Sequence, residues 1–422
     1  MSNLPNVTGH YPVNYAGNIP SNKSTPDLDL FFWYFKPPKP SDNLIFWFNG
    51  GPGCASTNGL FVENGPWVYN NKTGNFETNP YSWHLEGHIV FVDQPFSVGL
   101  SLNNGSGVRN EHDVAKNFYG FLQNFYEAFP QLRSKNLTLT GESYAGMYVP
   151  YMAQYIQTQN ALTNKKEDLI KLRGIGIGNP VIGGSSVYSM LPLMEGFGFW
   201  GAKGPRADVR AKYIKDLKSC KLPVPSAADF FRSQNESHFC LSDSNGPTIL
   251  DLFYNEIDNI KYADFHALTC TTTMIAGVLT PEARKTLHAK PLKSGEWTEW
   301  STIGGANPNV AYLPNFTDNV APSHVLLDGL IKSGVKVVIY SGNRDMVVDH
   351  LLTESVLQAA YWNGGSGFKN LPMNPWSAGE KEPAGAYISE RGLTYVLVYG
   401  AGHMVPQYQP RKASALLRDF IL

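Results

Sequence analysis

Short apolar runs recur along the chain, each closed by a turn signal, at 43–50, 88–95, 136–143, 172–180, 335–342 and 393–400. Runs of this length predict buried β-strands. Between them, apolar residues recur at spacings of three and four, most clearly from 111 to 129, which predicts an amphipathic helix. Further helices are predicted at 145–158, 322–333, 351–362 and 407–421. This alternation indicates an α/β fold whose mostly parallel sheet is covered on both faces.

The alternation stops after Pro180. From 184 to 320 the pattern is irregular, holds three of the four cysteines and includes turn-rich stretches such as GEWTEWSTIGGANPNV. We therefore predict a core formed by 1–183 and 321–422, interrupted by an inserted cap subdomain at 184–320.

The composition is that of an ordinary folded protein. Of the 422 residues 16% are charged, and the formal net charge is -1. This balance gives no reason to expect nucleic acid or an anionic membrane surface as a partner. No stretch approaches the ~20 continuous apolar residues of a membrane span.

The sequons predict passage through the secretory pathway, and the start of the chain is interpreted with that in mind. The chain opens with MSNLPNVTGH, without the basic start and apolar run of a signal peptide, so we expect the numbering to begin after a removed segment. Triplets of the form N-x-S/T predict N-glycosylation and begin at Asn6, Asn22, Asn71, Asn104, Asn136, Asn235 and Asn315. We expect a soluble protein of an oxidising compartment, either secreted or vacuolar/lysosomal.

A serine between glycines is the first candidate for chemistry. The segment GESYAG at 141–146 follows an apolar run and precedes a helical pattern, which is the context of the G-x-S-x-G nucleophile elbow. In that elbow a sharp turn exposes the serine Oγ above the sheet. Glycine and serine are common, so the pattern alone is more often an ordinary loop. The flanking strand and helix favour Ser143 as a nucleophile.

A serine nucleophile needs a histidine base that a carboxylate orients, in the chain order serine, acid, histidine. Asp345 and His403 each follow a predicted strand, in that order. Most of the ten histidines would be structural in a single-site enzyme, and an aspartate after a strand is more often a turn residue. Asp349 and His350 compete for the two roles. Position favours Asp345 and His403, because His350 adjoins the acid region and does not follow a later strand.

A second glycine-rich stretch, FNGGPGCASTNGLFVENGP, also follows a predicted strand. By composition alone it is a stiff turn. In α/β-hydrolases an early loop of this kind supplies one N–H group of the oxyanion hole, and the residue after the nucleophile, here Tyr144, supplies the other.

Several segments together carry a family resemblance: WFNGGPGCAS, NPYSW, FVDQP, GESYAG, GNP, YSGNRD and GAGHMVPQYQP, spread from Trp47 to Pro410. They resemble the serine carboxypeptidase family, which includes yeast vacuolar, wheat and lysosomal enzymes. The resemblance implies an α/β-hydrolase fold with Ser143 as nucleophile, His403 as general base and acid, and Asp345 as its orienting carboxylate. It also implies an oxyanion hole from the N–H groups of Gly51 and Tyr144. The implied binding residues for the substrate's terminal carboxylate are Asn49, Gly50, Glu63 and Glu142.

The function that follows from this resemblance is a serine exopeptidase that releases single C-terminal amino acids through an acyl-enzyme, with no cofactor and no metal. We expect Met404, next to the base, to line the pocket for the leaving residue. The even set of four cysteines allows two disulfides in three pairings, and the resemblance suggests Cys54–Cys270 and Cys220–Cys240. The expected partners are peptide and protein C-termini, and the expected assembly is a monomer or homodimer.

The two glutamates give the expected activity a pH dependence. Two carboxyl groups close together in a sheltered site cannot both ionise cheaply, so at least one stays protonated in acid. A protonated glutamic acid can donate a hydrogen bond to the substrate's carboxylate, whereas an ionised one repels it. We therefore expect the highest activity at acidic pH.

Two alternative functions stay open: a serine carboxypeptidase-like acyltransferase on the same scaffold, and an inactive hydrolase fold that serves as a binding protein. Transferases that resemble this family tend to carry GDSY at the elbow, whereas this chain has Glu142. An inactive protein usually lacks a triad member, and all three are present.

The family's usual segments are altered at Ala55, a minor change, and at Asn343, which replaces an aspartate two residues before Asp345.

Overall fold

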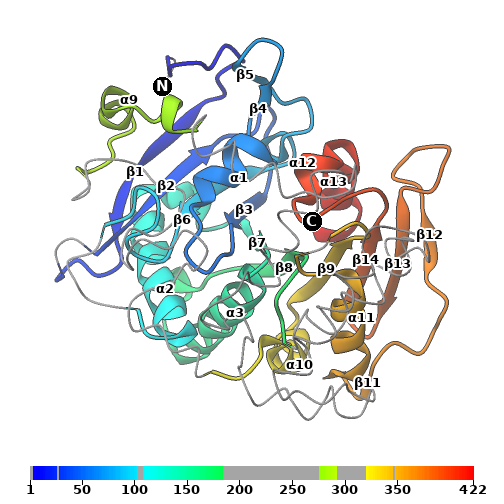
Figure 1. Ribbon diagram of the computed structural model, residues 1–422. Helices are drawn as coiled ribbons and strands as arrows, with labels where there is room; N and C mark the ends of the chain where they lie inside the picture. The colour runs from blue at the N-terminus through cyan, green and yellow to red at the C-terminus, as the bar shows by residue number, and fades with distance from the viewer. Residues whose placement is uncertain (1–2, 26–27, 103–107, 184–274, 292–319, 346) are drawn as a thin grey trace, which may run out of the picture.

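The computed structural model of the chain describes residues 3–25, 28–102, 108–183, 275–291, 320–345 and 347–422. A ten-stranded sheet runs through these ranges (Figure 1). From one edge to the other its strands are β1 (Asn14–Pro20), β2 (Asp29–Phe35), β6 (His88–Asp93), β3 (Asn43–Phe48), β7 (Asn136–Glu142), β8 (Leu172–Gly178), β9 (Lys336–Gly342), β14 (Leu393–Val398), β13 (Gly385–Glu390) and β12 (Asn374–Trp376).

The six strands predicted from apolar runs form the centre of this sheet. They are β6, β3, β7, β8, β9 and β14, and each pairs in parallel with its neighbours in this set. The strands that flank them, β1 and β2 on one side and β13 and β12 on the other, pair antiparallel. The prediction of a mostly parallel central sheet is therefore confirmed, and the antiparallel edges were not predicted.

Both faces of the sheet are buried, which explains why the central strands read as continuous apolar runs. Alternate residues of one strand enter two different hydrophobic cores. In β3, Phe46 and Phe48 belong to one core, and Ile45 and Trp47 belong to the other. All four of these side chains are fully buried.

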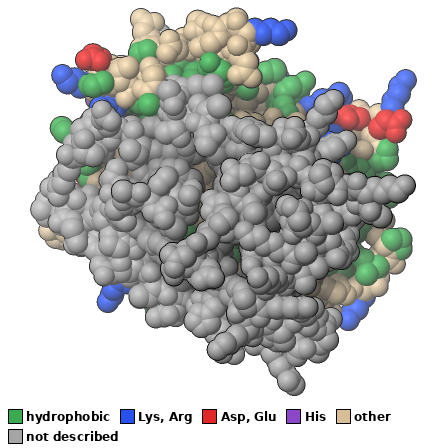
Figure 2. Space-filling view, viewed as in Figure 1, with side chains coloured by type: hydrophobic (Ala, Val, Ile, Leu, Met, Phe, Trp, Pro, Cys, Tyr) green, Lys and Arg blue, Asp and Glu red, His purple; other side chains and the backbone are tan. Residues whose placement is uncertain are grey.

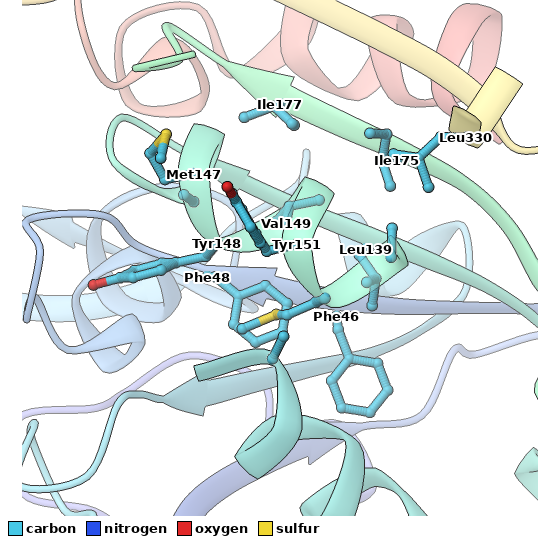
Figure 3. Packing of buried hydrophobic residues seen from close by; sticks show 14 of the residues in the cluster. Phe46, Phe48, Leu139, Met147, Tyr148, Val149, Tyr151, Ile175, Ile177 and Leu330 are labelled. Atoms are coloured by element: carbon cyan, nitrogen blue, oxygen red, sulfur yellow. The ribbon is translucent and has the colours of Figure 1, made fainter. Parts of the chain in front are cut away.

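Helices cover each face. The first core includes residues of α2 (Glu111–Ala128), α3 (Ala145–Leu162), α10 (Leu327–Lys332) and α11 (His350–Ala359). The second includes residues of α1 (Ser56–Val62), α9 (Pro281–Thr286) and α13 (Pro410–Leu416). Figure 3 shows the first core around α3, where Val149 and Tyr151 of the helix lie among Phe46, Leu139 and Ile175 of the sheet.

The predicted helices are present, with three differences at their ends. The segment expected as one helix at 407–421 is divided into α12 (Val405–Tyr408), α13 and a π-helical turn (Leu417–Ile421). Proline has no N–H to donate, so Pro410 can only begin a new helix, which is α13. The helix expected at 351–362 ends at Ala359 and is followed by β10 (Tyr361–Trp362), which pairs with β11 (Gly365–Ser366). The helix expected at 322–333 begins as a 3₁₀ turn (Ser323–Leu326) and continues as α10.

Most of the predicted cap lies outside the described residues. The described piece, 275–291, packs against the second core through Ile275, Val278 and Leu287, and the ammonium group of Lys290 pairs with Asp29 at the start of β2. The division into core and cap therefore stays a prediction.

Within the described ranges, no helix combines the length and the apolar character that a membrane crossing needs. On the face of the molecule drawn in Figure 2, the visible charged side chains are scattered around the rim and include both basic and acidic residues.

Asp93, the last residue of β6, anchors the amino end of α1. Its Oδ1 atom accepts a hydrogen bond from the Thr57 N–H at 2.9 Å, and its Oδ2 atom accepts one from the Leu100 N–H at 2.9 Å. Burial raises the pKa of Asp93 to about 6, although these N–H donors act in the opposite direction. A carboxyl group that titrates inside the core thus holds the helix that leads to Glu63.

We expect this raised pKa to appear in the stability of the protein. Between about pH 4 and pH 6 the folded protein holds a proton that the unfolded chain releases, so the stabilisation is full at the lower pH and is lost as pH rises through the folded-state pKa. Compared with Asp93→Asn, which does not titrate, the wild type should lose roughly 3 kcal/mol of unfolding free energy over this interval. Urea unfolding of both proteins across the interval measures the difference. The prediction is contradicted if the unfolding free energy of the wild type, minus that of Asp93→Asn, stays constant or increases as pH rises over this interval.

Candidate active site

Five adjacent parallel strands end at the same edge of the sheet, and a polar residue closely follows each. In the order β3, β7, β8, β9 and β14, these residues are Asn49, Ser143, Asn179, Asp345 and His403. Carboxyl ends of parallel strands share one edge, which is where ligands bind in open α/β sheets. The structure therefore gathers all three predicted triad residues at the place where a site is expected.

Ser143 lies on a sharp turn between β7 and α3. Its φ of 61° is in the left-handed region, where a residue with a side chain is strained. Its N–H donates to the Gly178 carbonyl at 2.9 Å, and its own carbonyl accepts from Gly146 and Val181, both at 2.9 Å. These bonds hold the turn so that the half-buried Ser143 stands between strand and helix.

The elbow departs from the five-residue pattern in one position. Ala145 occupies the place of the second glycine, and Gly146 follows it. A Cβ at Gly146 would lie 2.5 Å from the Val181 carbonyl oxygen and 2.8 Å from Cβ of Pro180. The turn thus needs its glycine one residue later than the G-x-S-x-G pattern places it, because the chain leaving β8 passes there.

The structure pairs His403 with Asp345. Nδ1 of His403 lies 2.8 Å from Oδ2 of Asp345, and the aspartate is fully buried while the histidine is 9% exposed. The carboxylate also accepts a hydrogen bond from the Val347 N–H at 2.7 Å. A carboxylate at Nδ1 favours the tautomer with the proton on that atom, which leaves Nε2 available as a base.

The competing pair is arranged differently. The Asp349 side chain caps α11, where its Oδ1 atom accepts from the Leu352 N–H at 2.9 Å. His350 is the first residue of that helix, and burial lowers its pKa. The geometry thus favours Asp345 with His403 over Asp349 with His350.

Asn179 is a site residue that the sequence reasoning did not identify. It is fully buried, and its Nδ2 atom donates to Oδ2 of Asp345 at 2.5 Å. Its Oδ1 atom accepts from the Gly342 N–H at 3.3 Å, so the amide links the loops after β8 and β9. The only signal in the sequence was the segment GNP after a predicted strand, which does not reveal which carboxylate the amide meets.

The glycine-rich loop after β3 lies directly against the elbow. A Cβ at Gly50 would overlap the Tyr144 nitrogen and lie 2.9 Å from Cβ of Ser143. Gly51 has a φ of 111°, which favours glycine. The Gly53 N–H donates to the Tyr148 hydroxyl at 3.1 Å, which ties the loop to α3. This close approach brings the loop of Gly51 against Tyr144, and the oxyanion hole formed by their N–H groups stays a prediction.

A buried pair of carboxyl groups lies beside this loop. Glu63 is 2% exposed and Glu142 is 4% exposed. Nδ2 of Asn49 donates to Oε1 of both, at 3.0 Å and 3.1 Å. Oδ1 of Asn49 accepts from the Trp47 indole N–H at 2.9 Å and the Gly59 N–H at 3.1 Å, which fixes the orientation of the amide. Asn49 therefore holds the two glutamates together.

The surroundings of the pair favour its protonated form. Burial raises the pKa of both carboxyl groups. For Glu142 the negative charge of nearby Glu63 adds to this effect, so its pKa lies well above the ordinary value. The pair therefore holds a proton to a higher pH than an isolated carboxyl group would.

Comparison with known proteins gives the family. A model described as serine carboxypeptidase matches residues 5–422. The chain belongs to the serine carboxypeptidase family. The family predicted from the short segments is thereby confirmed.

Relatives of this chain include several pheromone-processing carboxypeptidases. The protein from Aspergillus terreus is 33% identical over 430 residues, which cover 96% of this chain and 65% of the relative. The protein from Tuber melanosporum is 31% identical over 428 residues, which cover 96% of this chain and 66% of the relative. The chain thus spans just under two thirds of the length of these relatives.

A solved structure shows the fold. The crystal structure of Kex1(delta)p, a prohormone-processing carboxypeptidase from Saccharomyces cerevisiae, matches with a TM-score of 0.74 at 24% identity. The match covers 98% of this chain and 92% of that chain. Together with the sheet order and the helices on both faces, this confirms the predicted α/β-hydrolase fold.

Asn343, one of the two positions that depart from the family's usual segments, has a structural role. Oδ1 of Asn343 accepts a hydrogen bond from the Gly400 N–H at 2.7 Å, and the Asn343 N–H donates to the Val398 carbonyl at 3.1 Å. The loop of the acid is thereby joined to the loop of the histidine. A carboxylate oxygen could accept the same bond, which explains how asparagine can replace aspartate here.

The remaining predicted residues fall partly outside the described ranges. Met404 is 5% exposed and lies directly before α12. Cys54 is half-buried next to the glycine-rich loop, and its predicted disulfide partner, Cys270, lies outside the described residues, as do Cys220 and Cys240. Of the predicted glycosylation sites, three are exposed, Asn136 is half-buried, and Asn104, Asn235 and Asn315 lie outside the described residues. The three exposed ones are Asn6, Asn22 and Asn71.

In the part of the chain that the structure describes, no cluster of three or more His, Cys, Asp or Glu side chains is arranged to hold a metal ion.

The contact between Asn179 and Asp345 predicts the effect of Asn179→Asp. This change keeps the shape of the side chain, but it replaces an N–H donor with a second carboxyl group facing Oδ2 of Asp345. The orientation of His403 should weaken, and the rate at which a serine-directed phosphonylating reagent labels Ser143 should fall about 100-fold.

A matched control is Asn343→Asp, the same substitution two residues before Asp345. It keeps the oxygen that accepts from Gly400, so labelling should stay within a few-fold of the wild-type rate. Equal rates for Asn179→Asp and the wild type would show that Asn179 does not support the acid.

Proposed function

We propose that this protein is a serine exopeptidase that releases single C-terminal amino acids from peptides and proteins and is most active at acidic pH. The observation that carries the proposal is the buried carboxyl pair beside the nucleophile. Glu142 directly precedes Ser143, and its carboxyl group meets Glu63 at the amide of Asn49. An acid group that stays protonated at this point can recognise a substrate's free terminal carboxylate.

In the proposed reaction, Nε2 of His403 removes the proton from Oγ of Ser143 as Oγ attacks the carbonyl carbon of the last peptide bond. The negative charge on the carbonyl oxygen is stabilised by the N–H groups of Gly51 and Tyr144. His403 then gives the proton to the leaving amino group, and an acyl-enzyme on Ser143 remains. A water molecule, deprotonated by His403, attacks the ester and releases the shortened peptide. Asp345 orients the imidazole and stabilises its positive charge throughout.

The terminal carboxylate is proposed to bind between the glycine-rich loop and the carboxyl pair. Protonated Glu142 donates a hydrogen bond to it, and the N–H of Gly50 lies on the adjacent loop. Both amide hydrogens of Asn49 already point to the two glutamates, so its main contribution is to position them. Met404 is proposed to border the pocket of the released residue.

We also propose a location and an assembly. The exposed sequons Asn6, Asn22 and Asn71 support glycosylation in the secretory pathway, with the protein secreted or delivered to a vacuole or lysosome. The disulfides Cys54–Cys270 and Cys220–Cys240 belong to the same proposal. The protein is expected to act on peptide or protein C-termini as a monomer or homodimer.

The proposed activity can be tested with a panel of N-blocked dipeptides between about pH 4 and pH 7, the range in which a raised carboxyl pKa acts. Free C-terminal amino acid should be released, most rapidly at the acidic end, and prior treatment with the phosphonylating reagent should abolish the release. Transfer of an acyl group to an alcohol without peptide cleavage would favour the acyltransferase. A protein that neither cleaves nor becomes labelled would favour a binding protein.

The role of the carboxyl pair predicts the behaviour of Glu142→Gln. Glutamine is a permanent N–H donor, so KM for a free-acid dipeptide should become nearly independent of pH, whereas the wild-type KM should rise as the pair ionises. In the range where the wild type is fully protonated, the variant should bind as well as the wild type or a few-fold more weakly.

A suitable control is Glu354→Gln in α11. Glu354 is a half-buried carboxyl group that also has a raised pKa, but it accepts a hydrogen bond from the Tyr395 hydroxyl at 3.2 Å. Its replacement should leave the pH profile of KM as in the wild type. An unchanged profile for Glu142→Gln would remove Glu142 from carboxylate recognition.

A further inference from the structure

A tyrosine in the acid strand shares a row of the sheet with the carboxyl pair. Glu142 of β7 is paired with Gly178 of β8, and Gly178 is paired with Tyr340 of β9. Residues in one row of a parallel sheet point their side chains to the same face. Glu142 and Tyr340 are therefore neighbours across a residue that has no side chain, about 10 Å apart along the row.

The missing side chain at Gly178 admits the ring of Tyr340. A Cβ at Gly178 would lie 2.5 Å, 2.6 Å and 2.7 Å from Cε2, Cζ and Oη of Tyr340. The hydroxyl end of the ring thus lies over β8 and points from β9 towards β7. Any larger residue at 178 would prevent this approach.

The hydroxyl group of Tyr340 is a hydrogen-bond donor without an acceptor, and the carboxyl pair has acceptor oxygens without a donor. Tyr340 is 1% exposed, and its hydroxyl has no hydrogen-bond partner among the described residues. Oε2 of Glu142 and Oε2 of Glu63 also have no hydrogen-bond partner among the described residues. Burial, together with the charges of Glu142 and Glu63, raises the pKa of Tyr340 well above its ordinary value, so the phenol keeps its proton.

We propose that Tyr340 is a positioning residue for the Glu63–Glu142 pair: its O–H donates to the pair when the pair loses its last proton. It thereby sets the pH at which the site stops binding a free C-terminal carboxylate. This inference rests on the proposed exopeptidase function. The approach of Tyr340 over Gly178 is the geometry that carries it.

The direction of the effect follows from the strength of the bond. A hydrogen bond to an ionised acceptor is about twice as strong as one to a neutral acceptor. The hydroxyl therefore favours the ionised pair, against the burial and mutual repulsion that oppose it. The other charged groups that act on the pair, Asp345 and His403, lie on the loops after β9 and β14 and do not change with a substitution at Tyr340.

The test is Tyr340→Phe, which keeps the ring over Gly178 and removes only the hydroxyl. With an N-blocked dipeptide that has a free carboxylate, the pH at which KM rises should move upward by about one unit, while kcat changes little. With the matching C-terminal amide, which carries no carboxylate, KM should be the same in both proteins at every pH. Titration with the phosphonylating reagent counts the folded, competent enzyme in each preparation.

Tyr126→Phe is the matched control. Tyr126 is also 1% exposed, and its hydroxyl has no partner among the described residues, but its ring faces the guanidinium of Arg133 instead of the carboxyl pair. Its profile should coincide with that of the wild type. If the wild type cleaves the free acid and Tyr340→Phe shows no shift or a downward shift, the inference about Tyr340 is wrong and the proposed function stands. If the wild type releases no amino acid, the proposed function is wrong and the inference falls with it.

Discussion

The parallel register of β3, β7, β8, β9 and β14 is the constraint on which the rest of the structure depends. It brings the segments after five strands to one edge, where backbone and side-chain hydrogen bonds connect each loop to the next. Both faces of these strands are buried, so a slip of one residue would exchange the contents of the two cores. Trp47, for example, would have to leave the second core for the space that Phe46 and Phe48 fill. The packing of the core therefore fixes the geometry of the site.

The site also requires the loop after β3 to pack closely against the elbow and against α1, and glycine residues allow these contacts. Gly50 lies against the elbow, and a Cβ at Gly59 would come 2.6 Å from Oδ1 of Asn49. Because Gly59 has no side chain, Oδ1 of Asn49 can accept a hydrogen bond from the Gly59 N–H while Nδ2 donates to both glutamates. Two buried carboxyl groups are thus held side by side by one oriented amide. Buried acids are poorly solvated, so this arrangement costs stability, and the proposed binding of a substrate's carboxylate would account for that cost.

Sequence patterns predicted the central strands and the triad, because both depend on local order along the chain. A strand buried on both faces reads as an apolar run, and Ser143, Asp345 and His403 each follow such a run. Edge strands such as β1, with its exposed and half-buried positions, lack that run, although β2 is buried throughout and its signal was overlooked. Asn179 and Tyr340 could not be recognised in this way. Their roles depend on which residue lies beside them on the neighbouring strand, and a single strand carries no information about its register.

The distance between nucleophile and carboxyl pair has a consequence for the proposed specificity. Glu142 ends β7 and Ser143 begins the elbow, so one peptide unit separates the group that would bind the terminal carboxylate from the group that would attack. The strained φ of Ser143 and its bonds to Gly178 and Val181 prevent this spacing from relaxing. A substrate held by its terminal carboxylate then presents its last peptide bond, and no earlier one, to Oγ. Removal of single residues would follow from the rigidity of the turn, and the side chain of the released residue would affect only how well it fits.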